Sequence, residues 1–380
     1  MNAVLDAGER AHAAALAGLN AMTPKRLSSL LRRHRPSEAW EVAMGRADDP
    51  VAGPWFRRHP LLLGEFRTSG ARRPPDEVWD RCRSTGTSVL LLDDPEYPAC
   101  LRGDPEAPAV LFARGDPTAL DARRAGIVGT RNATDGGRRL ATRLGRELAQ
   151  AGITVVSGLA RGIDGCAHRG VLAASPAVGG APVAVVASGP DHPFPREHRD
   201  LWEEVVDRGL LVSEHPPGAP PLADWFPLRN RILAALSEVL VVVESRERGG
   251  SLVTARMATE RQIPVLAVPG SLLNRAAEGT NRLIADGSSA VLDSTDVLIA
   301  LGLETKRAGR RRHEHRPRPS SLDRTVLDAF AGDPLTLDHV VLRTGLGITE
   351  VALAVGRLEA GGWLASSAGW YEPVGAAAVG

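Results

Sequence analysis

Short runs of consecutive apolar residues recur along the middle of the chain, separated by longer stretches that contain polar residues. These runs are residues 126–128, 153–156, 183–186, 210–212, 239–243 and 265–268. Most of the stretches between them have helical periodicity, and one carries Leu140, Leu144 and Leu148 on a single face. Apolar strands that alternate with amphipathic helices indicate a parallel sheet covered on both faces. We therefore expect an α/β fold, with a doubly wound, Rossmann-like parallel sheet in residues 106–303.

The chain before this region has a different pattern. Alanine and leucine at helical spacing over residues 11–31 predict helix, and Thr23 and Pro24 suit the N-cap and first position of a second helix. Several prolines and three tryptophans follow. Residues 1–105 are therefore expected to form a small helical accessory domain.

The carboxyl-terminal part divides in two. Residues 306–321 hold seven basic residues, one acidic residue and two prolines without apolar periodicity, which predicts a solvated linker over residues 304–320. Three short helical stripes and an aromatic segment suited to a hairpin follow, and this is the layout of a winged helix, expected at residues 321–374. Its candidate recognition helix, residues 348–358, carries one cation and one anion, which favours a protein-contact or weak accessory role over duplex recognition.

Composition and charge limit the classes of function. The chain has 46 basic and 45 acidic residues, so any affinity for a nucleic acid must come from a local patch. Three cysteines without a CxxC pair suggest neither a metal site nor a disulfide framework. No apolar run approaches the ~20 residues that span a bilayer, and Asp6, Glu9 and Arg10 do not fit the apolar core of a signal peptide. We expect a cytoplasmic protein with no membrane partner, metal or cofactor.

The first candidate binding motif follows the apolar run at residues 126–128. Gly129, Thr130 and Arg131 form a turn that leads into a helix. The free backbone N–H groups and the dipole of such a helix attract phosphate, and an arginine binds phosphate through two parallel hydrogen bonds. An ordinary tight turn would have the same glycines, so this motif alone leaves both interpretations open.

Further turns of the same kind follow other strands. They contain Ser157, Gly158 and Arg161; then Arg229, Asn230 and Arg231; and then Gly250 and Ser251. The two arginines that flank Asn230 have no obvious use in a core. Asp164 and His168 are spaced i, i+4 but lack further ligands, so a helix contact or an N-cap role for Asp164 is favoured over a metal pair. Turns at strand ends converge on one edge of a parallel sheet, which predicts a surface for a phosphate backbone with few acid–base candidates.

These motifs together resemble the DNA-processing protein A family, also called DprA or Smf. The resemblance rests on Gly129 to Arg131, residues 157–164, 226–231, 250–256 and 268–270, and covers about residues 108–297. It implies an extended Rossmann domain that binds single-stranded DNA, forms a homodimer through that domain and loads the RecA recombinase during natural transformation, without catalytic activity. The tail is similar to the winged helix of many members, and the first part resembles their SAM-like helical domain.

The same resemblance assigns roles to individual residues. Arg131 would bind a backbone phosphate, and Ser157, Gly158 and Arg161 would line the same pocket. Asp191 and Phe194 fall in the following loop, where an aromatic ring can stack on a base. The rim would be completed by Arg229, Asn230, Arg231, Gly250 and Ser251. Here residues 187–195 read Ala-Ser-Gly-Pro-Asp-His-Pro-Phe-Pro and depart from the family's Gly-x-Gly-x-Asp…Tyr-Pro pattern.

Two other functions remain as alternatives. The sheet is also similar to nucleotide-binding or nucleotide-sugar-hydrolysing enzymes of the lysine-decarboxylase-like type, whose Gly-Gly-x-Gly-Thr-x-x-Glu motif supplies a catalytic carboxylate. Aligning its glycine pair on Gly249 and Gly250 puts Arg256 at the glutamate position, and an arginine cannot act as that carboxylate. A transcription regulator that uses the winged helix on duplex DNA would fit the tail but would leave the motifs of the sheet unexplained.

Overall fold

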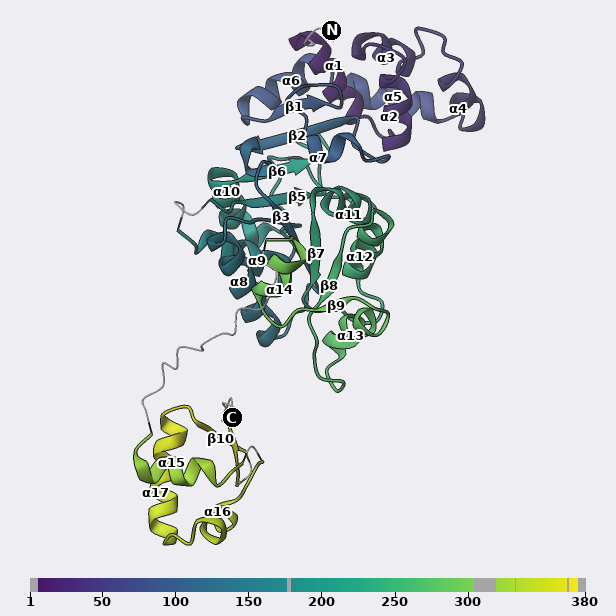
Figure 1. The fold of residues 1–380 in the computed structure, drawn as a ribbon. Coiled ribbons are helices and arrows are strands. Elements are labelled where there is room, and N and C mark those ends of the chain that lie inside the picture. The colour runs from purple at the N-terminus through teal and green to yellow at the C-terminus, as the bar shows by residue number, and fades with distance from the viewer. Residues whose placement is uncertain (1–5, 176–178, 304–318, 332, 368, 375–380) are drawn as a thin grey trace. The chain divides into compact units, whose positions relative to one another are not determined.

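The computed structural model describes residues 6–175, 179–303, 319–331, 333–367 and 369–374. The chain forms two compact units, residues 1–307 and residues 308–380. The first is built on a nine-stranded sheet of order β1-β2-β6-β5-β4-β3-β7-β8-β9 (Figure 1). Its strands are β1 (Ser88–Leu91), β2 (Val110–Gly115), β3 (Arg124–Val128), β4 (Thr154–Ser157), β5 (Pro182–Val186), β6 (Leu210–Ser213), β7 (Val239–Val242), β8 (Val265–Ala267) and β9 (Ser289–Ala290).

The expected α/β fold with a Rossmann-like sheet is confirmed, and six of its strands coincide with the six apolar runs. The sheet is mixed, however, because β1 pairs antiparallel with β2 and β2 antiparallel with β6, while the other seven strands are parallel. It also begins at Ser88, inside the segment expected to be purely helical. The run of β1 is short and follows a helix, so hydrophobic periodicity alone does not separate it from the end of that helix.

Helices cover both faces of the sheet (Figure 1). On one face lie α8 (Asp135–Gln150), α9 (Ile163–Leu172), α10 (Arg199–Arg208) and α14 (Ser294–Ala300); on the other lie α11 (Trp225–Leu236), α12 (Gly250–Glu260) and α13 (Glu278–Ala285). Successive strand residues point to opposite faces. Ile127 and Val241 accordingly pack in the α8 layer, whereas Val128 and Val242 pack in the α11 layer. This two-sided burial explains why the strands are continuous apolar runs.

The amino-terminal helices share a core with the antiparallel end of the sheet. They are α1 (Ala7–Ala17), α2 (Pro24–Leu31), α3 (Pro36–Ala43), α4 (Ala52–Arg58), α5 (Leu62–Arg72) and α6 (Pro75–Ser84), and the short α7 (Ala99–Arg102) follows β1. Thr23 caps α2 as expected, accepting a hydrogen bond from the Arg26 N–H at 3.3 Å. Val89 of β1 and Phe112 of β2 are buried in the same cluster as these helices. The helical segment therefore packs on the sheet through β1 and β2.

The second unit has the winged-helix layout. Helices α15 (Ser321–Asp328), α16 (Leu337–Thr344) and α17 (Ile348–Ala360) precede a hairpin of β10 (Leu364–Ser367) and β11 (Trp370–Pro373). Val326, Phe330, Val351 and Leu358 lie in its core. Most of the expected linker, residues 304–318, lies outside the described residues. No single helix in the described ranges is long and apolar enough to cross a membrane; α16 and α17 together pass that test of length and composition, but with a bend of 116° between them.

The strand order creates one special position at the carboxyl ends of the parallel strands. β3 lies between β4 and β7, so the chain winds outward from β3 in one direction up to β6 and then returns to start again at β7. Loops that follow β3 and β7 therefore turn to opposite faces and leave a crevice between them. Such switch points are where doubly wound sheets bind their ligands.

Candidate nucleic-acid interface

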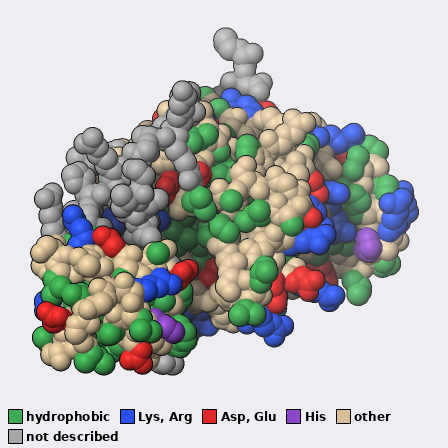
Figure 2. Space-filling model, turned by 60° about the horizontal axis from the view of Figure 1, so that its bottom comes forward, with side chains coloured by type: hydrophobic (Ala, Val, Ile, Leu, Met, Phe, Trp, Pro, Cys, Tyr) green, Lys and Arg blue, Asp and Glu red, His purple; other side chains and the backbone are tan. Residues whose placement is uncertain are grey.

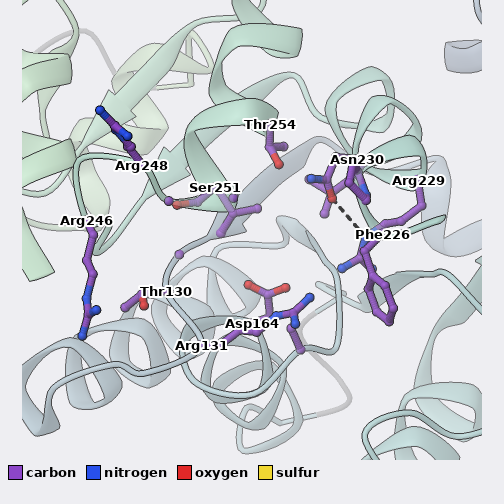
Figure 3. Close-up of a pocket in the computed structure, with 17 residues that line it drawn as sticks. Thr130, Arg131, Asp164, Phe226, Arg229, Asn230, Arg246, Arg248, Ser251 and Thr254 are labelled. Carbon is purple, nitrogen blue, oxygen red and sulfur yellow. Dashed lines mark hydrogen bonds between the residues drawn. The ribbon is translucent and has the colours of Figure 1, made fainter. Parts of the chain in front are cut away.

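A pocket of about 360 Å³ lies at this switch point (Figure 3). Its walls come from the loop after β3, the start of α9, the first turns of α11 and the loop between β7 and α12. Of the thirteen residues expected at the site, the seven that line it are Gly129, Thr130, Arg131, Arg229, Asn230, Gly250 and Ser251. Motifs separated by about 120 residues thus meet at one edge, as their positions after the strands predicted.

Arg131 is an exposed side chain at the pocket. Its guanidinium carbon lies 5.1 Å from the centroid of the Phe226 ring, at cation–π distance. Phe226 in turn contacts Phe194, with ring centroids 5.4 Å apart. Arg131 forms no ion pair within 4.0 Å in the described chain, although its charge acts on the Asp164 carboxyl group, whose pKa it helps to lower against the effect of burial. The cation is held beside the Phe226 ring and is exposed to an anion that enters the pocket.

The N-terminus of α12 faces the pocket from the opposite side. Its N-cap is Gly249, and no side chain accepts a hydrogen bond from the first-turn N–H groups. A Cβ at Gly249 would lie 2.2 Å from the Ser245 hydroxyl, whereas the space around Gly250 is open. Arg246 and Arg248 line the pocket next to this helix start, and neither forms an ion pair in the part of the chain that the structure describes. The helix dipole and two free guanidinium groups therefore favour an anion here.

The N-terminus of α8, by contrast, is already occupied. The carboxylate of Glu244, which follows β7, accepts hydrogen bonds from the Thr134 N–H at 2.9 Å and the Thr134 hydroxyl at 2.5 Å. Gly137 packs against this carboxylate so closely that a Cβ would lie 2.3 Å from its carbon. The expectation that the turn after β3 offers phosphate the free end of a helix is therefore wrong. Glu244 supplies the negative charge from within the protein.

The two arginines that flank Asn230 are buried, which corrects the interpretation that they have no use in a core. Arg229 donates to the Gly158 carbonyl at 2.9 Å and to the Val185 carbonyl, and it lines the pocket. Burial lowers the pKa of Arg229 to about 10, against the opposing effect of Asp164. A Cβ at Gly158 would lie 2.3 Å from the Arg229 guanidinium, so this glycine makes room for the arginine.

Arg231 does not line the pocket. It forms a buried ion pair with Glu214, and burial raises the pKa of that carboxyl group while Arg231 opposes the rise. Successive helix positions point in different directions, and two residues along α11 are enough to turn Arg231 away from the side that Arg229 faces. Arg231 is therefore part of the core of this unit.

The remaining expected residues also lie outside the pocket. Ser157 is buried and donates to the Ile127 carbonyl at 2.6 Å. Arg161 pairs with Glu197 at the surface, and this contact raises the pKa of Arg161. Asp191 accepts from the Gly218 N–H at 2.6 Å and pairs with Arg81 at 2.7 Å. Of this group Phe194, which is 40% exposed, stays close to the site through its contact with Phe226.

Several lining residues were missed by the sequence analysis: Asp164, Phe226, Arg246, Arg248 and Thr254. Arg246 and Arg248 belong to the glycine-rich turn after β7, whose pattern already indicated an anion-binding turn, although only Gly250 and Ser251 of it were assigned to the site. Asp164 is 6% exposed, and burial raises the pKa of its carboxyl group, opposed by Arg229 and by hydrogen bonds from backbone N–H groups. Asp164 lies in the pocket because of how α9 packs, and the sequence around Asp164 does not predict that packing.

Arginines line the pocket from both sides (Figure 3). Arg246, Arg248 and the α12 N-terminus lie at one side, whereas the other side carries Phe226, Asn230 and Arg229, with Arg131 next to Phe226. On the face drawn in Figure 2, basic side chains occur in small groups with carboxylates between them. No three histidine, cysteine or carboxylate side chains come together as a metal site among the described residues. This arrangement can bind a phosphate with a ring beside it.

Comparison with known proteins agrees with these features. Residues 88–302 match the family model described as DNA recombination-mediator protein A, and residues 312–369 match that of the DprA winged helix domain. A DNA processing protein DprA of Bacillus subtilis is 42% identical over 58% of this chain and 73% of its own length. A putative DNA processing protein DprA of Mycobacterium tuberculosis is 34% identical over 90% of this chain and 92% of its own.

Two solved structures are similar as well. The X-ray structure of DNA processing protein A from Streptococcus pneumoniae has a TM-score of 0.63 at 27% identity, and the alignment covers 79% of this chain and 98% of that one. The protein from Helicobacter pylori, whose structure addresses its mode of binding single-stranded DNA, has a TM-score of 0.51 at 27% identity, covering 57% and 95% of the two chains. The family match spans the strands that build the pocket and extends into the winged helix. The chain therefore belongs to the DNA recombination-mediator protein A family, known as DprA or Smf.

Proposed function

We propose that this protein binds single-stranded DNA at the switch-point pocket and acts there as a recombination mediator. The observation that carries the proposal is that three arginines without ion pairs in the described chain, Arg131, Arg246 and Arg248, line one pocket together with an uncapped helix start. Arginines and helix N-termini are the groups that bind phosphate oxygens in protein–DNA contacts. The related Helicobacter pylori protein binds single-stranded DNA, which supports the same ligand for this chain.

The shape of the pocket favours a single strand over a duplex. Its cations line a concavity of about 360 Å³, a volume suited to a group as small as a nucleotide. Duplex readout uses a helix or ribbon that protrudes into a groove. Phe226 and Phe194 add rings beside the cations, and stacking on unpaired bases is the usual sequence-tolerant contact of single-strand binders.

The same geometry argues for binding over catalysis. Asp164 is the single carboxylate among the lining residues, and backbone N–H groups and Arg229 surround it. Arg256, which stands at the position of the enzyme family's glutamate, has a side chain that is 70% exposed and lies 3.7 Å from Glu260, outside the pocket. A glycoside-cleaving site needs an accessible, paired set of carboxylates. The nucleotide-sugar hydrolase alternative therefore lacks its reacting groups.

Protection of the strand, loading of a RecA-type recombinase and a homodimer formed through the sheet domain complete the proposal, and these rest on membership of the family. A test of the central claim uses the full chain and fluorescence anisotropy with matched single-stranded and duplex oligonucleotides. We expect tighter binding of the single strand, weakening steeply as salt increases because phosphate neutralisation releases counterions. Preference for the duplex, or no salt-sensitive binding, would disprove it. Sedimentation velocity tests the dimer, and RecA filament assembly on coated single strands tests the loading step.

A further inference from the structure

Helices α8 and α9 present a group of arginines that the pocket does not use. The two helices lie side by side on one face of the sheet (Figure 1). They pack so closely that a Cβ at Gly145 would lie 2.2 Å from the Ala167 carbonyl oxygen, and one at Gly170 would lie 2.1 Å from that of Thr142. Because the helices touch backbone to backbone, their outward residues belong to one surface. We call it the α8–α9 arginine surface; its exposed cations are Arg138, Arg139, Arg143, Arg146 and Arg169.

The charges on this surface are not balanced. Asp135 lies 4.0 Å from Arg138, and Glu147 lies 3.7 Å from Arg143. Glu147 also accepts a hydrogen bond from Ser294, so its charge is shared with α14. No ion pair within the described chain involves the other three cations, which are Arg139, Arg146 and Arg169. A chain with nearly equal numbers of basic and acidic residues thus has a local positive excess on one helix pair.

The surface begins at the pocket. The loop that carries Arg131 leads into α8, and the loop after β4, whose Ala160 lines the pocket, leads into α9. Both helices then run back from the carboxyl edge of the sheet. Arg139 and Arg146 are seven residues apart, which is about two turns and roughly 10 Å along the helix, and they lie on nearly the same line of the exposed side. Cations without partners therefore follow one another from the pocket down the side of the domain.

We propose that a single strand leaving the pocket continues across the α8–α9 arginine surface, where Arg139, Arg146 and Arg169 bind its phosphates. This inference rests on the proposed function, because the pocket anchors the strand. The partner is the sugar–phosphate backbone of the same strand. The surface has cations but no exposed aromatic side chain among α8 and α9 residues, so it binds phosphates without contacting bases. A groove that tracks the backbone beside a stacking site is how sequence-tolerant single-strand binders extend their contact.

The inference separates short from long oligonucleotides. In the full chain, the triple variant Arg139→Gln/Arg146→Gln/Arg169→Gln keeps every pocket residue. A thymidine oligonucleotide of about four nucleotides fills little more than the pocket, whereas one of about twenty nucleotides exceeds the larger single-domain footprints. We expect the triple variant to bind the long one roughly ten- to hundred-fold more weakly and to reduce the slope of log K against log salt by about two, for three lost phosphate contacts. The affinity of the triple variant for the short oligonucleotide, measured by competition, should stay within about two-fold of the parent value.

The control removes the same charge elsewhere. Arg57, Arg58 and Arg72 are exposed, lie on α4 and α5, and form no ion pair in the described chain. Their triple glutamine variant should leave both affinities close to the parent value. Equal losses of affinity in the two triple variants would show a general effect of net charge and would overturn the inference. So would an unchanged affinity of the Arg139/Arg146/Arg169 variant for the long oligonucleotide, or an equal loss of its affinity for both lengths. If Arg131→Ala binds the short oligonucleotide as tightly as the parent protein does, the proposed binding of DNA in the pocket is wrong. That result is distinct from a failure of the α8–α9 arginine surface.

Discussion

Replacing Arg131 with alanine tests the pocket where its geometry is most explicit. The side chain is exposed, forms no ion pair in the described chain and packs its guanidinium 5.1 Å from the Phe226 ring centroid. Its removal breaks no side-chain hydrogen bond in the described chain, and Arg229 still faces the buried Asp164, so the fold should lose little stability. A charge-assisted hydrogen bond to phosphate contributes on the order of 1.5–3 kcal/mol, so Arg131→Ala should weaken binding of every single-stranded sequence roughly ten- to hundred-fold.

The ring gives the experiment a second arm. Phe226→Leu removes the cation–π contact that holds Arg131, about 0.5–1 kcal/mol at an exposed site, and a ring that can stack on a base, about 1–3 kcal/mol. Binding should therefore weaken by at least about ten-fold. Because Phe226 acts partly by holding the Arg131 guanidinium, the double variant should lose less than the sum of the two single losses. Arg131→Lys should restore affinity in part, since an ammonium lacks the planar pair of donors.

The assay is anisotropy of a labelled oligonucleotide at several salt concentrations, with circular dichroism to confirm the fold. Loss of one phosphate contact should lower the magnitude of the salt slope by about 0.7. Arg256→Ala is the matched control, because that arginine is on the neighbouring α12, paired with Glu260 and outside the pocket. Parent-like affinity in Arg131→Ala, or an equal loss in Arg256→Ala, would refute the assignment of Arg131 as a phosphate-binding residue.

Three further outcomes are expected. Gly137→Ala should destabilise the fold by about 1–3 kcal/mol through overpacking against Glu244, while Gly136→Ala, whose Cβ has no contact closer than 3.6 Å, should not; parent-like urea midpoints in both would contradict this packing. Burial lowers the pKa of His168 to about 3. Below pH 6.5 the unfolded chain therefore binds a proton at His168 that the folded protein does not bind. The free energy of unfolding should fall as pH drops from 6.5 toward 3. His168→Gln should shrink the difference between urea midpoints at pH 7 and pH 5, and an unchanged difference would argue against this linkage. Deleting residues 321–380 should leave oligonucleotide affinity within a few-fold, because the one arginine of α17 is paired with a carboxylate 2.6 Å away; loss of most of the affinity would place the winged helix in the DNA site.

The strands and the edge that carries the pocket could be predicted from the sequence. A strand buried on both faces must be apolar throughout, so its run is visible without any knowledge of its neighbours. Parallel strands also place their following turns at one edge, which brings Arg131 and Gly250 together although they are about 120 residues apart. The winged helix was predictable for a similar reason, since three short stripes and a hairpin are local features. Strands β1, β2 and β9 were not among the predicted runs; β1 has four residues and β9 two, too few to show a periodicity.

Only the tertiary structure decided which polar residues are free. Arg229 and Arg231 look like binding residues in the sequence, yet the first is held by Gly158, 71 positions away, and the second by Glu214, 17 positions away. Glu244 likewise occupies a helix start 110 positions before it, which no pattern around Thr134 reveals. Hydrophobic periodicity indicates which face of a helix or strand is buried. It does not indicate which distant residue the fold brings within a few ångströms of a charge to neutralise it. The sequence thus determined which edge of the sheet carries the pocket, and long-range packing determined which of its arginines are left without a carboxylate or carbonyl partner.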